Sequence, residues 1–130
     1  MNNFISTKED VANFLKNLID YINSKEFNCG EDLFLSYGRG NKNIDTLTFL
    51  DFDTSDVINE LRNLSLKDYS DTVVDNLNAN PRDLYVFGKY INNYLIYIKI
   101  KLRNVCNSKK QIICLSFHKA DHEMSFPYKN

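Results

Sequence analysis

The chain has 130 residues, of which 43% are hydrophobic and 25% charged, so we expect residues 1–130 to form one soluble globular domain. It contains no apolar run of about twenty residues, and its first residues lack the basic and apolar stretches of a secretory signal. These features predict a cytoplasmic protein with no membrane partner. The net charge of −1 excludes a molecule that is basic throughout, so any nucleic-acid site must come from local segregation of charge.

The cysteines of the chain, Cys29, Cys106 and Cys114, lack the spacing of a disulfide framework or a zinc site. We therefore expect free thiols in a reducing cytosol, and neither a metal nor another cofactor. No matched base is evident beside any of them, so none is assigned a nucleophilic role.

The first predicted element is a helix over residues 7–23. Ser6-Thr7-Lys8-Glu9 has the pattern of a capping box, in which the serine hydroxyl accepts from an orphan amide and the glutamate reaches back. Apolar side chains then recur at helical spacing, namely Val11, Phe14, Leu15, Leu18 and Ile22. Residues 33–37 are a short strand candidate, and the Gly-flanked residues 38–43 are predicted to form a loop.

A short helical turn is predicted over residues 43–50, with Leu47 and Leu50 pointing inward. Asp53 is placed to cap a second helix, because apolar side chains follow it on one helical face. These side chains are Val57, Ile58, Leu61 and, near the helix end, Leu64. The polar residues 70–83 are predicted to form a loop.

Three strands are predicted next, over residues 84–91, 94–103 and 111–118. Asn92-Asn93 suits a two-residue hairpin turn because asparagine tolerates positive φ, and residues 104–110 are expected to form a longer turn. Helices followed by an antiparallel meander predict an α+β fold. In this fold the N-terminal helices pack on one face of a small antiparallel sheet.

The strand at residues 94–103 alternates strictly between apolar and polar side chains. Ile96, Ile98, Ile100 and Leu102 point to one face, and Tyr97, Lys99, Lys101 and Arg103 point to the other. The first face predicts a core. The second, basic and bearing a tyrosine, suits a polyanion such as RNA, although a half-buried strand with solvated lysines has the same pattern. Residues 94–119 contain six lysines and arginines and no acid, which favours RNA.

Several short motifs occur in a characteristic order and spacing. They are Arg39-x-x-x-Asn43 followed by Leu47, Leu64-Ser65-x-x-Asp68-Tyr69, Val86-Phe87-Gly88-Lys89, Ile96-Tyr97-Ile98-Lys99, Leu115-Ser116-Phe117-His118 and Phe126-Pro127-Tyr128. Over residues 39–128, the chain resembles MqsR-type toxins of type II toxin–antitoxin systems. The resemblance implies a RelE-like fold, metal-independent mRNA cleavage and a partner antitoxin that holds the toxin inactive.

Three residues are candidates for catalysis: Tyr97, His118 and Lys99. The resemblance carries a functional tyrosine of the family onto Tyr97, and the neighbouring Lys99 is expected to favour its phenolate and so proton transfer. Stacking or packing is the alternative role for the tyrosine. His118 shares the face of Tyr97 if Phe117 joins the core, and an imidazole suits acid–base work in RNA cleavage.

His122 lies four residues after His118 in a polar tail and ranks lower as a candidate. Two histidines at this spacing, beside acidic residues, form a metal pair only on a helix, which Phe126-Pro127 disfavours. We expect no metal site here.

The candidates for binding RNA are Lys89, Lys101, Arg103, Arg39 and Tyr85. Lys89 follows Gly88, which predicts a bulge or a close backbone approach. Arg39 lies in the Gly-flanked loop, which can offer cations and backbone amides to phosphate, although a plain turn has the same sequence. Tyr85 offers a surface on which a base can stack.

The chain departs from the family pattern at Ser70 and Asp71, which follow Asp68-Tyr69 where the family carries a catalytic lysine. A family glutamine also has no clear counterpart. The alternative to an mRNA-cleaving toxin is therefore a non-catalytic inhibitor from a phage or mobile element, such as an anti-CRISPR protein, with another protein as its target. A third possibility is a regulatory module whose basic face binds an acidic protein.

Overall fold

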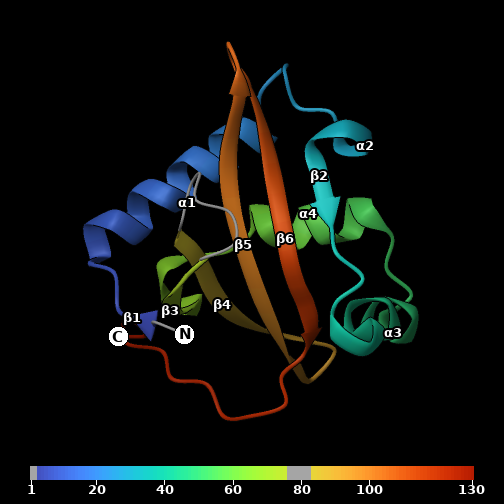
Figure 1. The fold of residues 1–130 in the computed structure, drawn as a ribbon. Coiled ribbons are helices and arrows are strands. Elements are labelled where there is room, and N and C mark those ends of the chain that lie inside the picture. Colours follow the sequence, from blue (N-terminus) through green and yellow to red (C-terminus); the bar gives the residue numbers. More distant parts are fainter. Residues whose placement is uncertain (1–2, 76–82) are drawn as a thin grey trace.

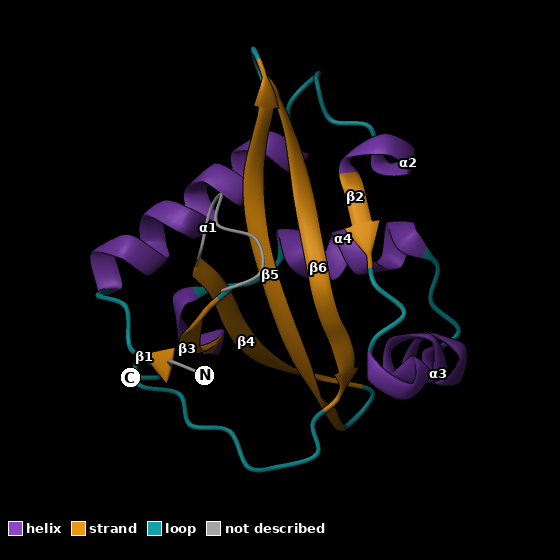
Figure 2. Cartoon of the chain, viewed as in Figure 1, coloured by secondary structure: helices purple, strands orange, loops and turns teal. Residues whose placement is uncertain are grey.

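The computed structural model describes residues 3–75 and 83–130, which form a six-stranded sheet with helices on one of its faces (Figures 1 and 2). In chain order the elements are β1 (Asn3–Phe4), α1 (Lys8–Ile22), α2 (Cys29–Asp32), β2 (Leu33–Leu35), the 3₁₀ turn η1 (Arg39–Asn41), α3 (Lys42–Leu50), α4 (Thr54–Arg62), the 3₁₀ turn η2 (Leu66–Asp68), β3 (Tyr69–Val74), β4 (Asp83–Ile91), β5 (Tyr94–Cys106) and β6 (Lys109–Lys119). The predicted α+β class is confirmed. Within the described residues, no helix is long and apolar enough to cross a membrane.

The long N-terminal helix is confirmed as α1, but its cap is one residue later than predicted. The Thr7 hydroxyl accepts from the Asp10 amide at 3.1 Å and so caps the helix. The Ser6 hydroxyl is instead buried and lies 2.7 Å from the Thr72 hydroxyl of β3. Ser6 therefore fastens the start of the chain to the sheet.

The second predicted helix is also confirmed, together with its cap. Asp53 and Asp56 form a reciprocal capping box at the start of α4. The three side chains predicted for its inner face, Val57, Ile58 and Leu61, are buried. They share one core with α1 and with the sheet face that carries Ile96, Ile98 and Ile100.

The three predicted strands are confirmed as β4, β5 and β6, all antiparallel with β5 in the centre. Asn92 and Asn93 both have positive φ, as the predicted tight hairpin requires. The second turn is shorter than expected, because β5 runs on to Cys106 and β6 begins at Lys109.

The sheet is larger than the sequence indicated, and it is mixed rather than antiparallel. Residues 69–74, which fall mostly in the predicted loop, form β3 and pair with β4. A bulge at Ser70 breaks the two-residue period there, which hid the strand from pattern reasoning. At the other edge, β2 pairs in parallel with β6, so the sheet order is β1-β3-β4-β5-β6-β2.

A second bulge, in β6, changes which side chains face outward. Lys99 pairs with Ser116 and Ile100 pairs with Cys114, which leaves Leu115 as the extra residue. Cys114 therefore points into the core and Leu115 to the opposite, outer face. Beyond the bulge the expected phase returns, so His118 lies on the outer face, paired with Tyr97.

Candidate active site

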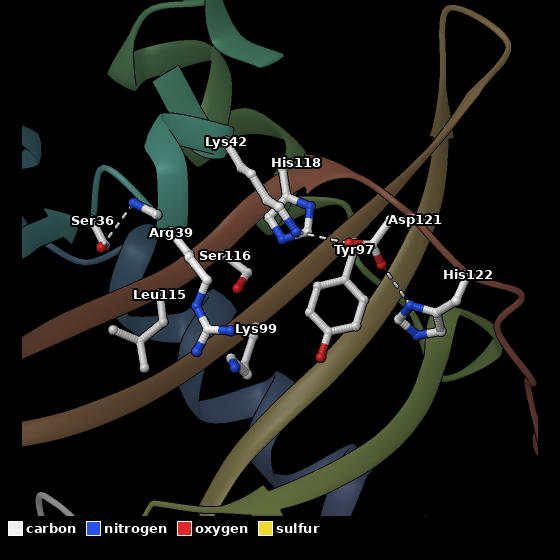
Figure 3. A pocket seen from close by; sticks show the side chains of 11 residues that line it. Ser36, Arg39, Lys42, Tyr97, Lys99, Leu115, Ser116, His118, Asp121 and His122 are labelled. Atoms are coloured by element: carbon white, nitrogen blue, oxygen red, sulfur yellow. Dashed lines mark hydrogen bonds and ion pairs between the residues drawn. The ribbon is translucent and has the colours of Figure 1, made fainter. Parts of the chain in front are cut away.

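The outer face of the sheet carries an open pocket of about 380 Å³ (Figure 3). Tyr97 and Lys99 reach it from β5, and His118 from β6. Residues of the loop before α3 and of the segment after β6 complete it. The lining residues are Ser36, Gly38, Arg39, Lys42, Tyr97, Lys99, Leu115, Ser116, His118, Asp121 and His122. The structure therefore brings all three predicted catalytic residues together with the predicted RNA-binding residue Arg39.

The loop that carries Arg39 is held against the sheet by one buried side chain, Asn43. Its amide nitrogen donates to the backbone oxygens of Ser36, at 2.7 Å, and Leu115, at 3.0 Å. Its amide oxygen accepts from the Phe117 backbone nitrogen at 2.9 Å. Asn43 thus satisfies two backbone oxygens and one backbone amide, and it fixes the loop beside the pocket.

Tyr97 lies in contact with two imidazoles. Its ring stacks on His118 with centroids 5.4 Å apart, and it meets His122 at 5.7 Å with an interplanar angle of 62°. Burial raises the pKa of Tyr97, and the charges of Asp71 and Asp121 raise it further. The expected phenolate is therefore wrong: the phenol stays protonated at neutral pH, and Tyr97 is suited to donate a hydrogen bond.

Lys99 is half-buried beside Tyr97 at the floor of the pocket. Burial lowers the pKa of its ammonium group, the nearby Arg39 lowers it further, and the Asp75 carboxylate opposes both. Two cationic side chains therefore face one small space, where an anion would relieve their mutual repulsion.

His118 is oriented by its own strand. Its Nδ1 lies 2.9 Å from the Lys119 carbonyl oxygen. Because a carbonyl only accepts, Nδ1 carries the proton in this hydrogen bond and Nε2 is left with a lone pair. This tautomer suits a base that takes a proton from a bound substrate.

His122 also lines the pocket, although sequence reasoning ranked it lower. Its Nδ1 lies 2.8 Å from one carboxylate oxygen of Asp121, and Lys42 donates to the other at 2.8 Å, as the dashed lines of Figure 3 show. The hydrogen bond from Lys42, followed by that from His122, lowers the pKa of Asp121. A chain of three polar side chains thus runs from α3 to the histidine.

The segment after β6 folds back toward β1 (Figure 1), and His122 of this segment contacts the Tyr97 ring. A Cβ atom at Gly88 would lie 2.8 Å from Met124 and from Phe126, so the predicted bulge or close backbone approach is replaced by two side chains packed against this glycine. The Tyr128 hydroxyl donates to the Ser6 backbone oxygen at 2.6 Å and so anchors the segment. In the sequence, Gly88 and the aromatic residues Phe126 and Tyr128 are the signals for this path.

Two of the predicted RNA-binding residues lie on the face of the sheet that the helices cover, not on the face that carries the pocket. Lys89 and Tyr85 pair with the core residues Ile96 and Ile100, so they point toward the helices. Lys89 forms an ion pair with Glu60 of α4 at 2.8 Å. Tyr85 stacks on Phe14 of α1, with ring centroids 4.2 Å apart. Neither side chain is placed to bind RNA at the pocket.

Lys101 lies on the outer face as predicted, but it is only 1% exposed. It forms an ion pair with Asp75 at 3.1 Å, so it is neither a solvated lysine nor placed to bind RNA. Arg103 contacts the side chain of Gln111 and lines a second pocket, which shares only Leu115 with the first. Arg103 therefore lies on the predicted face, outside the main pocket.

The described part of the chain holds no group of three or more histidine, cysteine, aspartate or glutamate side chains that could bind a metal ion. No family model, curated protein or solved structure matches this chain.

Proposed function

We propose that this protein is a metal-independent endoribonuclease, the toxin of a type II toxin–antitoxin system of the MqsR type. It would act on mRNA in the cytoplasm and be held inactive by a partner antitoxin. The observation that carries the proposal is the meeting of Tyr97, His118, Lys99 and Arg39 in one open pocket. Acid–base groups and cations at one site are what RNA transesterification needs without a metal.

The geometry supports one assignment of roles. His118 Nε2 takes the proton of a ribose 2′-hydroxyl, whose oxygen attacks the adjacent phosphorus. Lys99 and Arg39 stabilise the extra negative charge of the pentacovalent phosphorane, and the protonated Tyr97 hydroxyl donates a hydrogen bond to one of its oxygens. Cleavage of the bond from phosphorus to the 5′-oxygen leaves a 2′,3′-cyclic phosphate and a 5′-hydroxyl end.

The test is cleavage of a long mRNA by purified protein in the presence of EDTA, with the new 5′ ends analysed chemically. Wild type should cleave and leave 5′-hydroxyl ends. Tyr97→Phe should reduce the rate by roughly 10²-fold because the ring remains and only the donor is lost. Tyr90→Phe is the matched control, since Tyr90 is exposed and lies outside the pocket. A strict requirement for Mg²⁺ would rule out this mechanism.

A non-catalytic inhibitor, such as an anti-CRISPR protein, is the second candidate. It is favoured by the pairing of Lys89 with Glu60 and of Lys101 with Asp75, which removes two cations from the RNA-binding set. Absence of cleavage by wild type, together with tight binding to a protein target, would support this candidate instead.

A further inference from the structure

The pocket contains a second histidine that the roles above do not use. His122 contacts the Tyr97 ring, as His118 does, but it comes from the segment after β6 rather than from the sheet. Figure 3 shows the two imidazoles on different sides of the Tyr97 side chain. Two proton-transfer groups that approach one site from different directions fit a reaction in which one oxygen attacks phosphorus and another leaves.

The two histidines differ in what holds Nδ1. His118 faces a neutral backbone carbonyl, whereas His122 faces the Asp121 carboxylate, so a fully protonated His122 gains an ion-pair partner. Lys42 holds that carboxylate in place from the other side. In both rings Nδ1 is engaged, which leaves Nε2 to face a substrate.

We propose that His122 is the general acid of the RNA cleavage reaction, a role that rests on the proposed function. As the bond between phosphorus and the 5′-oxygen breaks, its electron pair stays on the oxygen, and His122 Nε2 transfers a proton to it. His118 has meanwhile accepted the proton of the 2′-hydroxyl. The two histidines exchange protonation states over one turnover, and solvent restores them before the next.

The groups around His122 are consistent with this role. Asp121 on its own segment and Lys42 from α3 form the chain described above. Tyr97 from β5 and Asp71 from β3 face it across the adjoining pocket, to which Glu123 also contributes. Three carboxylates, of Asp121, Asp71 and Glu123, line the two pockets that His122 shares, together with three cations, Lys42, Lys99 and Arg39.

The test compares two substrates in single-turnover cleavage. One is an RNA oligonucleotide that contains the cleavage site of the wild-type protein. The other carries sulfur in place of the 5′-oxygen at that site, and because a thiolate leaves far more readily than an alkoxide, it needs no general acid. Wild type, His122→Ala, His122→Gln and His118→Ala are assayed on both, with circular dichroism to verify that each variant is folded.

We expect both His122 variants to cleave the oxygen substrate about 10²-fold or more slowly and the sulfur substrate within about tenfold of wild type. His118→Ala should be slow on both substrates. Equal slowing of both substrates by His122→Gln, or no slowing of either, overturns the assignment while leaving the proposed function in place. No cleavage of any substrate by wild type overturns both.

Discussion

Lys99 and Lys101 show how differently two lysines on one strand face can be used. Both follow Tyr97 at the two-residue spacing of β5. Lys99 opens onto the pocket beside Arg39, whereas Lys101 is buried against Asp75. A buried charge is tolerated only when it is paired. The partner of Lys101, Asp75, lies 26 residues away in the chain. Nothing in the alternation of the strand could indicate that partner.

Replacing Lys101 with alanine should therefore act on stability rather than on RNA binding. The substitution removes the buried ion pair between Lys101 and Asp75, so we expect the free energy of unfolding to fall by roughly 3 kcal/mol. Urea denaturation measures this change. Lys110→Ala, at a lysine whose side-chain contact is with Asn104 near the tip of the β5–β6 hairpin, is the control and should change stability little. If Lys101→Ala kept wild-type stability but bound RNA more weakly, the original assignment of Lys101 to RNA binding would hold.

At the scale of elements, the sequence predicts best where a local pattern is unbroken. The periods of α1, α4 and β5 were read correctly because each buries one face over the residues that carry the pattern, such as Ile96, Ile98 and Ile100 of β5. The two bulges defeated the same reasoning, at Ser70 in the missed strand β3 and at Leu115 in β6. A bulge adds one residue without a distinctive composition, so only the pairing partner reveals it.

The candidate site was predictable to the extent that it depends on one hairpin. Tyr97, Lys99 and His118 follow from the pairing of β5 with β6, and Phe117 in the core sets the phase of His118. His122 depends instead on the path of an irregular segment, which follows from packing at Gly88 rather than from a period. Lys89 and Tyr85 lie on the core face because the tight turn at Asn92-Asn93 pairs them with Ile96 and Ile100.

Asn43 lies in α3 and anchors the Arg39 loop beside the pocket, so replacing it should affect both stability and RNA cleavage. In Asn43→Ala, two carbonyl oxygens and the Phe117 amide lose their partners in a buried place, and we expect the free energy of unfolding to fall by about 3 kcal/mol. RNA cleavage should fall as well, at temperatures where the variant is still folded, because the Arg39 loop loses its anchor. Thermal unfolding and single-turnover cleavage measure the two effects.

Asn17→Ala is the matched control for this variant, because Asn17 lies exposed on α1. It should leave both quantities near wild-type values. Full cleavage activity in a destabilised Asn43→Ala would show that the Arg39 loop does not need this anchor for function.

On the scale of the whole molecule, the sheet lies between the larger hydrophobic core and the pocket of the proposed chemistry. Helices α1 and α4 cover one face (Figure 2), and side chains of the other face line the pocket. Cys114 belongs to the covered face even though it lies two residues before Ser116 of the pocket. The ionisation of its thiol therefore depends on whether the core is folded.

Burial raises the pKa of Cys114 from 9.0 to about 12. Above pH 9 the unfolded chain loses this proton while the folded chain keeps it, so stability must fall as the pH rises. We expect the free energy of unfolding to drop by about 1 kcal/mol between pH 9 and 10, and by about 1.4 kcal/mol per pH unit above about pH 10, until the folded thiol itself ionises. Denaturant titrations of wild type and Cys114→Ala should differ by this slope, and parallel curves would contradict it.

The last prediction concerns the charge that the whole molecule presents to RNA. The net charge is −1, and two predicted cations are paired internally, so binding relies on a few side chains around the pocket. Counterion release from single-stranded RNA contributes a slope of about −0.7 per phosphate contact in a plot of log affinity against log salt. Arg39→Ala should make that slope shallower by about 0.7, because it removes one contact. Lys89→Ala, on the helix-covered face, should leave the slope unchanged. Fluorescence anisotropy with 2′-O-methyl RNA, which cannot be cleaved by transesterification, measures these slopes. Identical slopes for wild type and Arg39→Ala would mean that the outer face serves an acidic protein partner instead.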